Sequence, residues 1–228
     1  MAPEKQYPPG YGPVRPVADY RPWDTDEVFR PLYLAISEHT KVDEARCYLL
    51  WRAALQMGPV PGAFIEVGVW RGGTGALLSD AAARIGGDRH VYLADTFRGV
   101  VKAGPMDDYY RGGEHADTSR ETVEELLGEL GTGNYSVLEG VFPEETGTRV
   151  PDGPIALCHV DVDVYQSARD VTDWVWPRLP VGGLVVYDDY GFYGCEGVTA
   201  LGGELYDRSD ALFLHNLSGQ AALVRIAP

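Results

Sequence analysis

The stretch AFIEVGVWRGGTG, residues 63–75, decides the fold of this chain. Its apolar part, Phe64 to Val69, predicts a buried strand, and the glycines that follow predict a tight bend. The next segment carries apolar residues at helical spacing until Gly86, which predicts a helix. A strand, a glycine bend and a helix form the first half of a nucleotide-binding βαβ unit, because glycine lets the backbone approach a ligand closely. The alternative is that the glycines make only a tight turn.

An acid ends the second expected strand. The run HVYLA, residues 90–94, leads to Asp95, twenty-seven residues after Gly68. An acid at this place can hydrogen-bond both hydroxyls of a ribose. The bend has neither G-x-G-x-x-G nor G-K-[ST], and it carries Glu66, where a phosphate would be repelled. A ligand with a ribose and a carboxylate or ammonium group, but no phosphate, fits better, and S-adenosylmethionine is such a ligand.

Composition narrows the classes of function. At 228 residues and 45% hydrophobic, the chain has the size and composition of one large globular domain. Its formal charge of −15 argues against nucleic acid and anionic membranes as partners, because phosphate binding needs clustered lysine and arginine. The acidity favours a site for a cation, either a metal or a sulfonium. Three widely spaced cysteines, with no secretory signal and no spanning segment, predict a cytoplasmic protein.

The chain divides into an N-terminal arm and a domain. Residues 1–39 form the expected arm, whose first 31 residues hold seven prolines and exclude a regular helix or inner strand. Its aromatic residues indicate packing on its own domain or on a partner subunit. Residues 40–228 form the expected domain. Within it, residues 96–117 are a long loop rich in glycine, aspartate and tyrosine at the end of the second strand, which is typical of a lid.

Strands and helices alternate through the rest of the domain. Helices are expected to start from the capping patterns at Thr40, Thr118 and Ser167. Further strands are expected at 135–138, 155–160, 184–187, 212–216 and 222–226. This order predicts an α/β fold with a doubly wound, Rossmann-like sheet that is mostly parallel and ends in an antiparallel C-terminal strand.

Three aspartates follow two of these strands. Asp161 ends the strand at 155–160, and Asp188 and Asp189 end the strand at 184–187. Because the carboxyl ends of parallel strands meet at one edge of a sheet, these side chains are expected to converge beside Gly68 and Asp95. Clustered carboxylates repel one another unless a cation neutralises them, and oxygen ligands suit Mg²⁺, Ca²⁺ or Mn²⁺. The three aspartates are therefore the predicted metal ligands.

Other polar residues near these strand ends are less telling. Asp163 faces away from the site if the strand continues, and lies close to it if a loop has begun, so its role stays open. His159 sits late in an apolar strand and is expected in the core. His115 lies in the expected lid and could touch a substrate. Cys195 and Glu196 could line the pocket, but no nucleophile and base are paired, which argues against covalent catalysis.

Four segments together resemble the macrocin O-methyltransferase family: FIEVGVWRGG at 64–73, ADTFRG at 94–99, DVDVYQS at 161–167 and DDYG at 188–191. Members are small class I enzymes that use S-adenosylmethionine and Mg²⁺ to methylate sugar hydroxyls in antibiotic and related biosynthesis. The resemblance therefore implies a sugar-containing acceptor, either a nucleotide sugar or a glycosylated natural product, and a homodimer or larger homo-oligomer.

The resemblance also implies roles for residues. Those expected to bind the cofactor are Glu66, Gly68, Trp70, Arg71, Gly72, Asp95 and Gly140. Those expected to bind the metal are Asp161, Asp188 and Asp189, and Asp161 is also the expected general base. Val162 and Gln166 stand where the family usually has glycine and glutamate. After Cys195 the family usually has an arginine and a regular helix, whereas this chain has two glycine-containing segments, 196–198 and 202–203.

Three rival functions remain open from the sequence. The same metal chemistry would serve a methyltransferase of a catechol-like diol. A non-catalytic, cofactor-binding assembly protein would use the proline- and tyrosine-rich arm for oligomerisation. A branch of similar proteins associated with cephalosporin hydroxylation is disfavoured, because that branch has glutamate at the place of Asp188.

Overall fold

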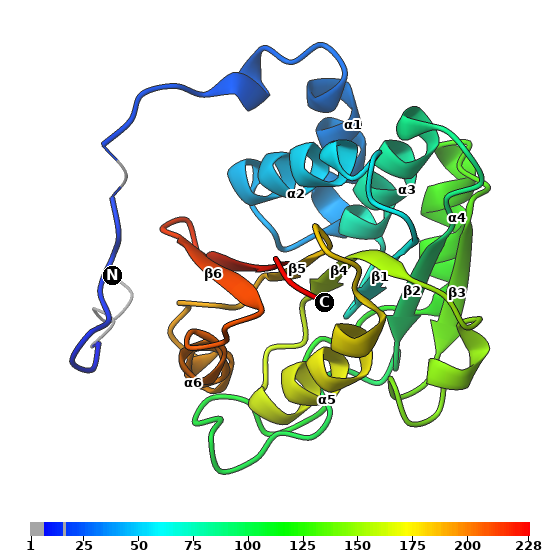
Figure 1. The fold of residues 1–228 in the computed structure, drawn as a ribbon. Helices are drawn as coiled ribbons and strands as arrows, with labels where there is room; N and C mark the ends of the chain where they lie inside the picture. The colour runs from blue at the N-terminus through cyan, green and yellow to red at the C-terminus, as the bar shows by residue number, and fades with distance from the viewer. Residues whose placement is uncertain (1–6, 16) are drawn as a thin grey trace.

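The computed structural model describes residues 7–15 and 17–228. A seven-stranded sheet with the order β3-β2-β1-β4-β5-β7-β6 lies between two layers of helices (Figure 1). The strands are β1 (Ala63–Val67), β2 (Val91–Asp95), β3 (Tyr135–Glu139), β4 (Ile155–Val160), β5 (Leu184–Tyr187), β6 (Ala211–Asn216) and β7 (Gln220–Arg225). Neighbours from β3 to β5 pair in parallel, and β7 pairs antiparallel with both β5 and β6. The predicted α/β, doubly wound sheet with an antiparallel C-terminal strand is confirmed.

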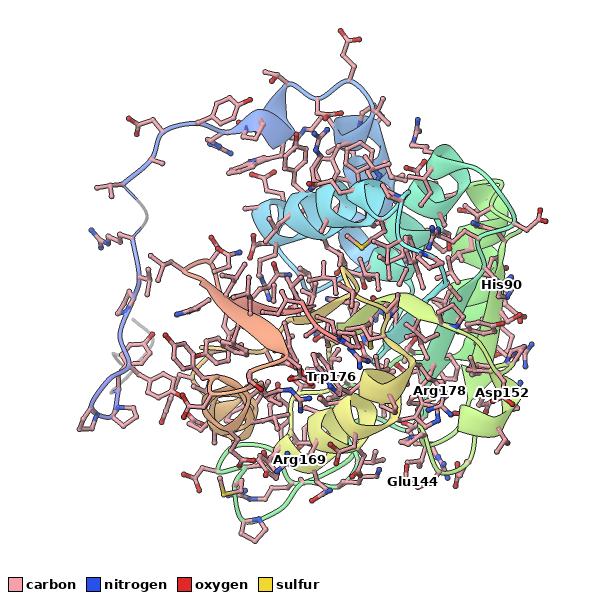
Figure 2. The ribbon with its side chains drawn as sticks, in the orientation of Figure 1. His90, Glu144, Asp152, Arg169, Trp176 and Arg178 are labelled. Carbon is pink, nitrogen blue, oxygen red and sulfur yellow. The ribbon has the colours of Figure 1, made fainter. Side chains whose placement is uncertain are left out.

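Helices cover both faces of the sheet. They are α1 (Phe29–Ile36), α2 (Glu44–Gln56), α3 (Gly73–Ile85), α4 (Arg120–Glu129), α5 (Tyr165–Val175) and α6 (Glu196–Leu205). Short 3-10 helices are η1 (Pro22–Asp24), η2 (Ser37–His39), η3 (Gly147–Arg149) and η4 (Trp176–Arg178). One apolar layer holds buried residues of α1 to α4, and the other holds those of α5 and α6. Figure 2 shows the side chains that fill these two layers.

The central strands explain why the carboxyl edge can hold polar groups. Every residue of β4 and β5 is buried, because helices cover both faces of this parallel sheet. After β1 the chain continues into α3 on one face of the sheet, and after β4 it continues into α5 on the other face. Because the two connections diverge, a crevice is left where β1 and β4 end. The functional residues predicted from the sequence fall at this edge.

The domain begins before residue 40. Within the expected arm, α1 and η2 are helical, and Phe29 and Ile36 are fully buried in the core. Proline at position 31 is tolerated because it lies in the first turn of α1, where the backbone N–H has no intrahelical partner. Only the part of the arm before η1 is extended, and Pro3 and Pro16 of that part lie outside the described residues.

The helix α6 forms despite its glycines, so the expected departure from a regular helix at this place is wrong. A Cβ on Gly197 would lie 2.2 Å from a carboxylate oxygen of Asp107, and one on Gly202 would lie 2.3 Å from the ring of Tyr190. These glycines therefore let the loop 96–117 and the segment after β5 pack directly on the helix.

The loop 96–117 contains no helix or strand and is tied to the start of α5. Asp107 accepts hydrogen bonds from the backbone N–H groups of Gly104 and Tyr165, each at 2.9 Å. Lys102 forms ion pairs with Glu144 and with Asp170. These contacts hold the loop against the crevice, and its action as a lid remains a prediction.

Candidate functional site

A cavity of about 360 Å³ opens at the carboxyl ends of the central strands. This volume is in the range of small-molecule sites. Seven of the predicted site residues line it: Gly68, Trp70, Asp95, Gly140, Asp161, Asp188 and Asp189. They come from the ends of β1, β2, β3, β4 and β5, so the sheet brings together residues that are far apart in the sequence.

The glycine bend requires glycine at position 68. Gly68 has a φ of +90°, and a Cβ there would lie 1.7 Å from the backbone oxygen of Asp161. Asp95 fixes the next part of the bend, because its Oδ2 accepts hydrogen bonds from the N–H groups of Val69 and Trp70, each at 2.8 Å. Asp95 thus shapes the bend and lines the cavity at the same time.

Three predicted cofactor residues are not among those that line the cavity. Glu66 is fully buried, and its Oε1 lies 2.8 Å from Nδ1 of His159. Arg71 pairs with Asp117 at 2.8 Å. Gly72 has a φ of +93°, precedes α3 and faces Val123 of α4. The alternation of side chains along β1 directs Glu66 into the interior, and the turn after it directs Arg71 across the surface. The contacts of these residues are therefore with other parts of the protein and not with the cavity.

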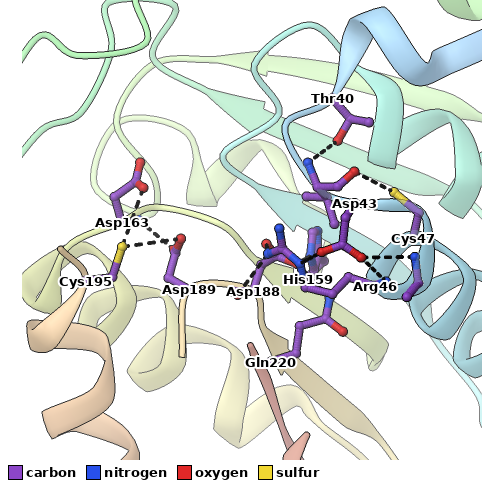
Figure 3. Close-up of polar contacts among 12 residues, drawn as sticks. Thr40, Asp43, Arg46, Cys47, His159, Asp163, Asp188, Asp189, Cys195 and Gln220 are labelled. Atoms are coloured by element: carbon purple, nitrogen blue, oxygen red, sulfur yellow. Dashed lines mark hydrogen bonds and ion pairs between the residues drawn. The ribbon is translucent and has the colours of Figure 1, made fainter. Parts of the chain in front are cut away.

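A buried polar network runs behind the cavity (Figure 3). His159 in β4 lies between Glu66 in β1 and Asp188, whose Oδ1 is 3.5 Å from its Nε2. Burial opposes the charged imidazole, but the nearby carboxylates of Asp188 and Glu66 raise the pKa of His159 to about 10. His159 lies in the core, as expected, and connects two buried carboxylates there.

Asp188 has three side-chain partners, which are Arg46, Gln220 and His159. Its Oδ2 forms an ion pair with Nη1 of Arg46, and its Oδ1 accepts a hydrogen bond from Nε2 of Gln220 at 2.6 Å. Arg46 in α2 is itself buried and also pairs with Asp43 at 2.7 Å. Burial raises the pKa of Asp188, but the nearby His159 imidazole and the charge of Arg46 bring it below its usual value.

Asp189 has a different environment. Its Oδ2 accepts hydrogen bonds from the backbone N–H groups of Val162, at 3.0 Å, and Asp163, at 2.7 Å. Asp163 has a φ of +65°, so the chain has left the strand and turns its carboxylate toward Asp189. Burial first, and then the charges of Asp163 and Asp188, raise the pKa of Asp189 well above its usual value. Burial and the charges of Asp188 and Asp189 do the same for Asp161.

These residues suit a hard divalent cation. One ligand atom each of Asp163, Asp189 and Cys195 lie within 4.8 Å of one another. Burial and the nearby aspartates raise the pKa of Cys195. Carboxylate oxygens are the donors that a hard divalent cation prefers to a thiol. Repulsion among Asp161, Asp163 and Asp189 is the condition that a bound cation relieves. The fit includes Asp163, whose role the sequence left open, and is weakest at Asp188, whose oxygens already have partners.

Sequence reasoning missed several residues that surround the site. Arg46 lies on the buried side of α2 with Cys47 and Leu50, so a lone arginine within an apolar helical stripe was the available signal. Tyr110, Phe192 and Tyr193 also line the cavity, and their place could not be read from loops of irregular sequence.

Fold and site together define a class I methyltransferase architecture. The solved structure of the O-methyltransferase NovP matches with a TM-score of 0.68 and 25% identity over 82% of each chain. The apo structure of CalS11, a TDP-rhamnose 3'-O-methyltransferase, matches in fold, with a TM-score of 0.59 and 18% identity over 88% of each chain.

The model of the macrocin-O-methyltransferase family matches residues 38–201, and the chain belongs to this family. One curated relative is 8-demethyl-8-(2,3-dimethoxy-alpha-L-rhamnosyl)-tetracenomycin-C 4'-O-methyltransferase of Streptomyces olivaceus, 33% identical over 60% of this chain. The chain spans 56% of the length of that relative. Within the described residues, no helix has both the length and the apolar character needed to cross a bilayer.

Proposed function

We propose that this protein is an S-adenosylmethionine- and Mg²⁺-dependent O-methyltransferase that methylates a sugar hydroxyl of a nucleotide sugar or a glycosylated natural product. The observation that carries the proposal is a single cavity with the glycine bend and Asp95 on one side and the strand-end carboxylates on the other. A methyl donor and a hydroxyl acceptor held in one cavity can be placed in line, and placement can contribute up to about 7–11 kcal/mol to lowering a barrier.

The bend side of the cavity is the proposed cofactor site. Gly68 leaves room for close backbone approach, and Gly140 has a φ of +136° at the end of β3, beside the same space. Asp95 offers carboxylate oxygens for a ribose, and Trp70 lies beside it in the lining of the cavity. The cofactor would supply an electrophilic methyl group on a sulfonium, whose positive charge suits the acidic lining of this cavity.

The carboxylate side is the proposed metal and acceptor site. Asp161 and Asp189, which both line the cavity, are the proposed principal ligands. Asp163 lies beside Asp189, and Asp188 would take part while paired with Arg46. Bound Mg²⁺ would lower the pKa of a coordinated hydroxyl and orient it. Asp161 is the proposed general base, because its carboxylate lines the cavity beside the proposed metal and acceptor site.

A calorimetric titration tests the proposal. S-adenosylhomocysteine is titrated first, and Mg²⁺ is then titrated into the loaded protein. We expect both to bind to the wild type, and we expect Asp189→Asn to weaken Mg²⁺ at least about tenfold while leaving S-adenosylhomocysteine nearly unchanged. Asp152→Asn is the matched control, because Asp152 is exposed and is not among the residues that line the cavity. It is labelled in Figure 2. Failure to bind S-adenosylhomocysteine would refute the methyltransferase proposal, and equal Mg²⁺ affinity in Asp189→Asn would refute the metal site.

Two further expectations belong to the same proposal. We expect a homodimer or larger homo-oligomer, because the arm before η1 exposes apolar side chains such as Val17. We also expect a cytoplasmic protein, which the three buried, unpaired cysteines support. Light scattering after size exclusion tests the first expectation, and a single monomer mass at micromolar concentration would refute it.

A further inference from the structure

The two edges of the sheet differ in how they are protected. At β3, a guanidinium N–H of Arg149 donates to the backbone oxygen of Val137 at 3.4 Å, and Val137 is only 4% exposed. At β6, Leu212 and Leu214 are 50% and 55% exposed, and the strand Ala211–Asn216 contains no proline, lysine, arginine or carboxylate. Natural sheets usually cover an edge or place such residues on it, because its unpaired backbone groups can bind another strand. The edge at β6 therefore lacks the usual protection.

Backbone groups of three β6 residues point away from the sheet. β6 pairs antiparallel with β7, and just beyond the strand the N–H of Ile226 donates to the backbone oxygen of Asp210 at 2.9 Å. Since bonded pairs alternate along an antiparallel ladder, the even-numbered residues of β6 bond to β7. The N–H and C=O groups of Ala211, Phe213 and His215 therefore face outward. Within the described residues, the order of the sheet leaves them without a strand on that side.

The N-terminal arm of the same chain, in its described part, does not cover this edge. Tyr7 and Tyr11 meet the ring of Tyr193, which lines the cavity, with ring centroids 5.5 and 6.1 Å apart. Between these tyrosines and η1 the arm runs outside the body of the molecule (Figure 1), and Val17 and Tyr20 are 98% and 81% exposed. The leucines of β6 stay half exposed with the arm in this place, so another partner is needed to cover them.

The edge is complementary to itself. When two copies place Phe213 opposite Phe213 in antiparallel pairing, Ala211 of each copy lies opposite His215 of the other. This register matches every outward N–H group with a C=O group. It also places Leu212 of each copy beside Leu214 of the other on one face of the joined sheet. The uncharged strand lets two chains of formal charge −15 approach where their repulsion is smallest.

We propose that two copies of this protein associate along β6, as an isologous dimer in which the two edges pair antiparallel and the two sheets become one. This inference rests on the expected homo-oligomer and gives it a surface, and it does not depend on the proposed methyl transfer. A strand of six residues is about 20 Å long, so the paired edges form an interface at the low end of the usual size range. We therefore expect a dissociation constant in the micromolar range.

Charge variants at the two exposed leucines test the pairing. Leu212→Lys/Leu214→Lys and Leu212→Glu/Leu214→Glu each put like charges opposite one another across the twofold axis, so we expect the dissociation constant of each dimer to rise at least about tenfold. A 1:1 mixture puts lysine opposite glutamate, so we expect the dimer mass to return. Sedimentation velocity over a dilution series in the micromolar range measures these masses. Val28→Lys/Leu34→Lys is the matched control, because it adds the same charge at exposed residues of the α1 region and should leave the mass unchanged.

The outcomes distinguish this inference from the other proposals. A wild type that is monomeric over the whole series overturns both this inference and the expected homo-oligomer, and leaves the edge for a strand of another protein. A wild-type oligomer that persists in both charge variants overturns this inference alone, and so do variants that stay monomeric when mixed. Urea unfolding of each variant checks its fold, and Leu214→Lys alone repeats the test if a double variant does not fold. Binding of S-adenosylhomocysteine in the same samples tests the methyltransferase proposal separately.

Discussion

Asp188 and Asp189 are neighbours in the chain and have opposite surroundings. Asp188 faces Arg46, His159 and Gln220, and these partners lower its pKa. Asp189 faces Asp163 and backbone N–H groups, and burial and repulsion raise its pKa. Successive residues at a strand end point to opposite sides, so one carboxylate meets the inner face of α2 and the other meets the loop after β4. This difference supports the proposal that Asp188 organises the site and that Asp189 binds the cation.

The largest expected effect comes from removing the positive charge of Arg46. Arg46→Met leaves the buried carboxylate of Asp188 without its ion-pair partner, and breaking a buried ion pair lowers the free energy of unfolding by about 3–5 kcal/mol. Urea denaturation measures the change. Arg120→Met is the control, because Arg120 pairs with Glu124 on the surface of α4 and should cost at most about 1 kcal/mol. Equal losses of unfolding free energy in the two variants would show that the Arg46–Asp188 pair stabilises the fold no more than a surface ion pair does.

A smaller effect separates the two aspartates by pH. With EDTA present to remove metal ions, Asp189 binds a proton more readily in the folded than in the unfolded protein. Its contribution to the free energy of unfolding is therefore present below about pH 4 and is lost as pH rises through its raised pKa. We therefore expect Asp189→Asn to gain stability relative to the wild type as pH rises toward neutrality, by at most about 1.4 kcal/mol per pH unit.

Asp188 should behave in the opposite way. Because its pKa is lowered, Asp188 makes a contribution to the free energy of unfolding that is present above about pH 4. This contribution is lost as pH falls through the pKa of Asp188 in the folded protein. Asp188→Asn should therefore be destabilised throughout the range from about pH 5 to 7, by about 1.5–3 kcal/mol for lost hydrogen bonds to a charged group. Thermal or urea unfolding of both variants over this range checks the contrast, and parallel pH profiles would contradict it.

The smallest expected effect concerns the neutral partner of Asp188. Gln220 is buried in β7 and donates one hydrogen bond to Oδ1 of Asp188 at 2.6 Å. Gln220→Leu keeps the volume roughly and removes the donor, so we expect a loss of about 1–2 kcal/mol, less than for Arg46→Met. Urea denaturation measures it, and Gln56→Leu on the end of α2 is a control that should stay within about 0.5 kcal/mol. A loss larger than that of Arg46→Met would reverse the ranking of the two partners.

The order of elements could be read from the sequence because it depends on local pattern. The apolar runs at β1, β4 and β5 are the strands that were expected there, since strands buried on both faces read as continuous apolar segments. Element starts were less accurate: α5 begins at Tyr165, whereas Ser167 was the expected start, because Ser167 instead packs inward and donates to the backbone oxygen of Val101. The helix α1 was missed because Pro31 reads as a helix breaker outside its first-turn context.

By itself, the sequence determined the alternation of strands and helices, the glycine at position 68 and the convergence of three strand-end aspartates, because these follow from side-chain period and from the shared edge of parallel strands. Only the tertiary structure decided which aspartate is neutralised. The answer depends on Arg46 from α2 and Gln220 from β7. Both are far from Asp188 in the chain and reach it only when α2 packs on the sheet and β7 pairs with β5. It also decided that tyrosines of the arm stand at the cavity mouth, because an extended, proline-rich segment carries no periodic signal of where it returns.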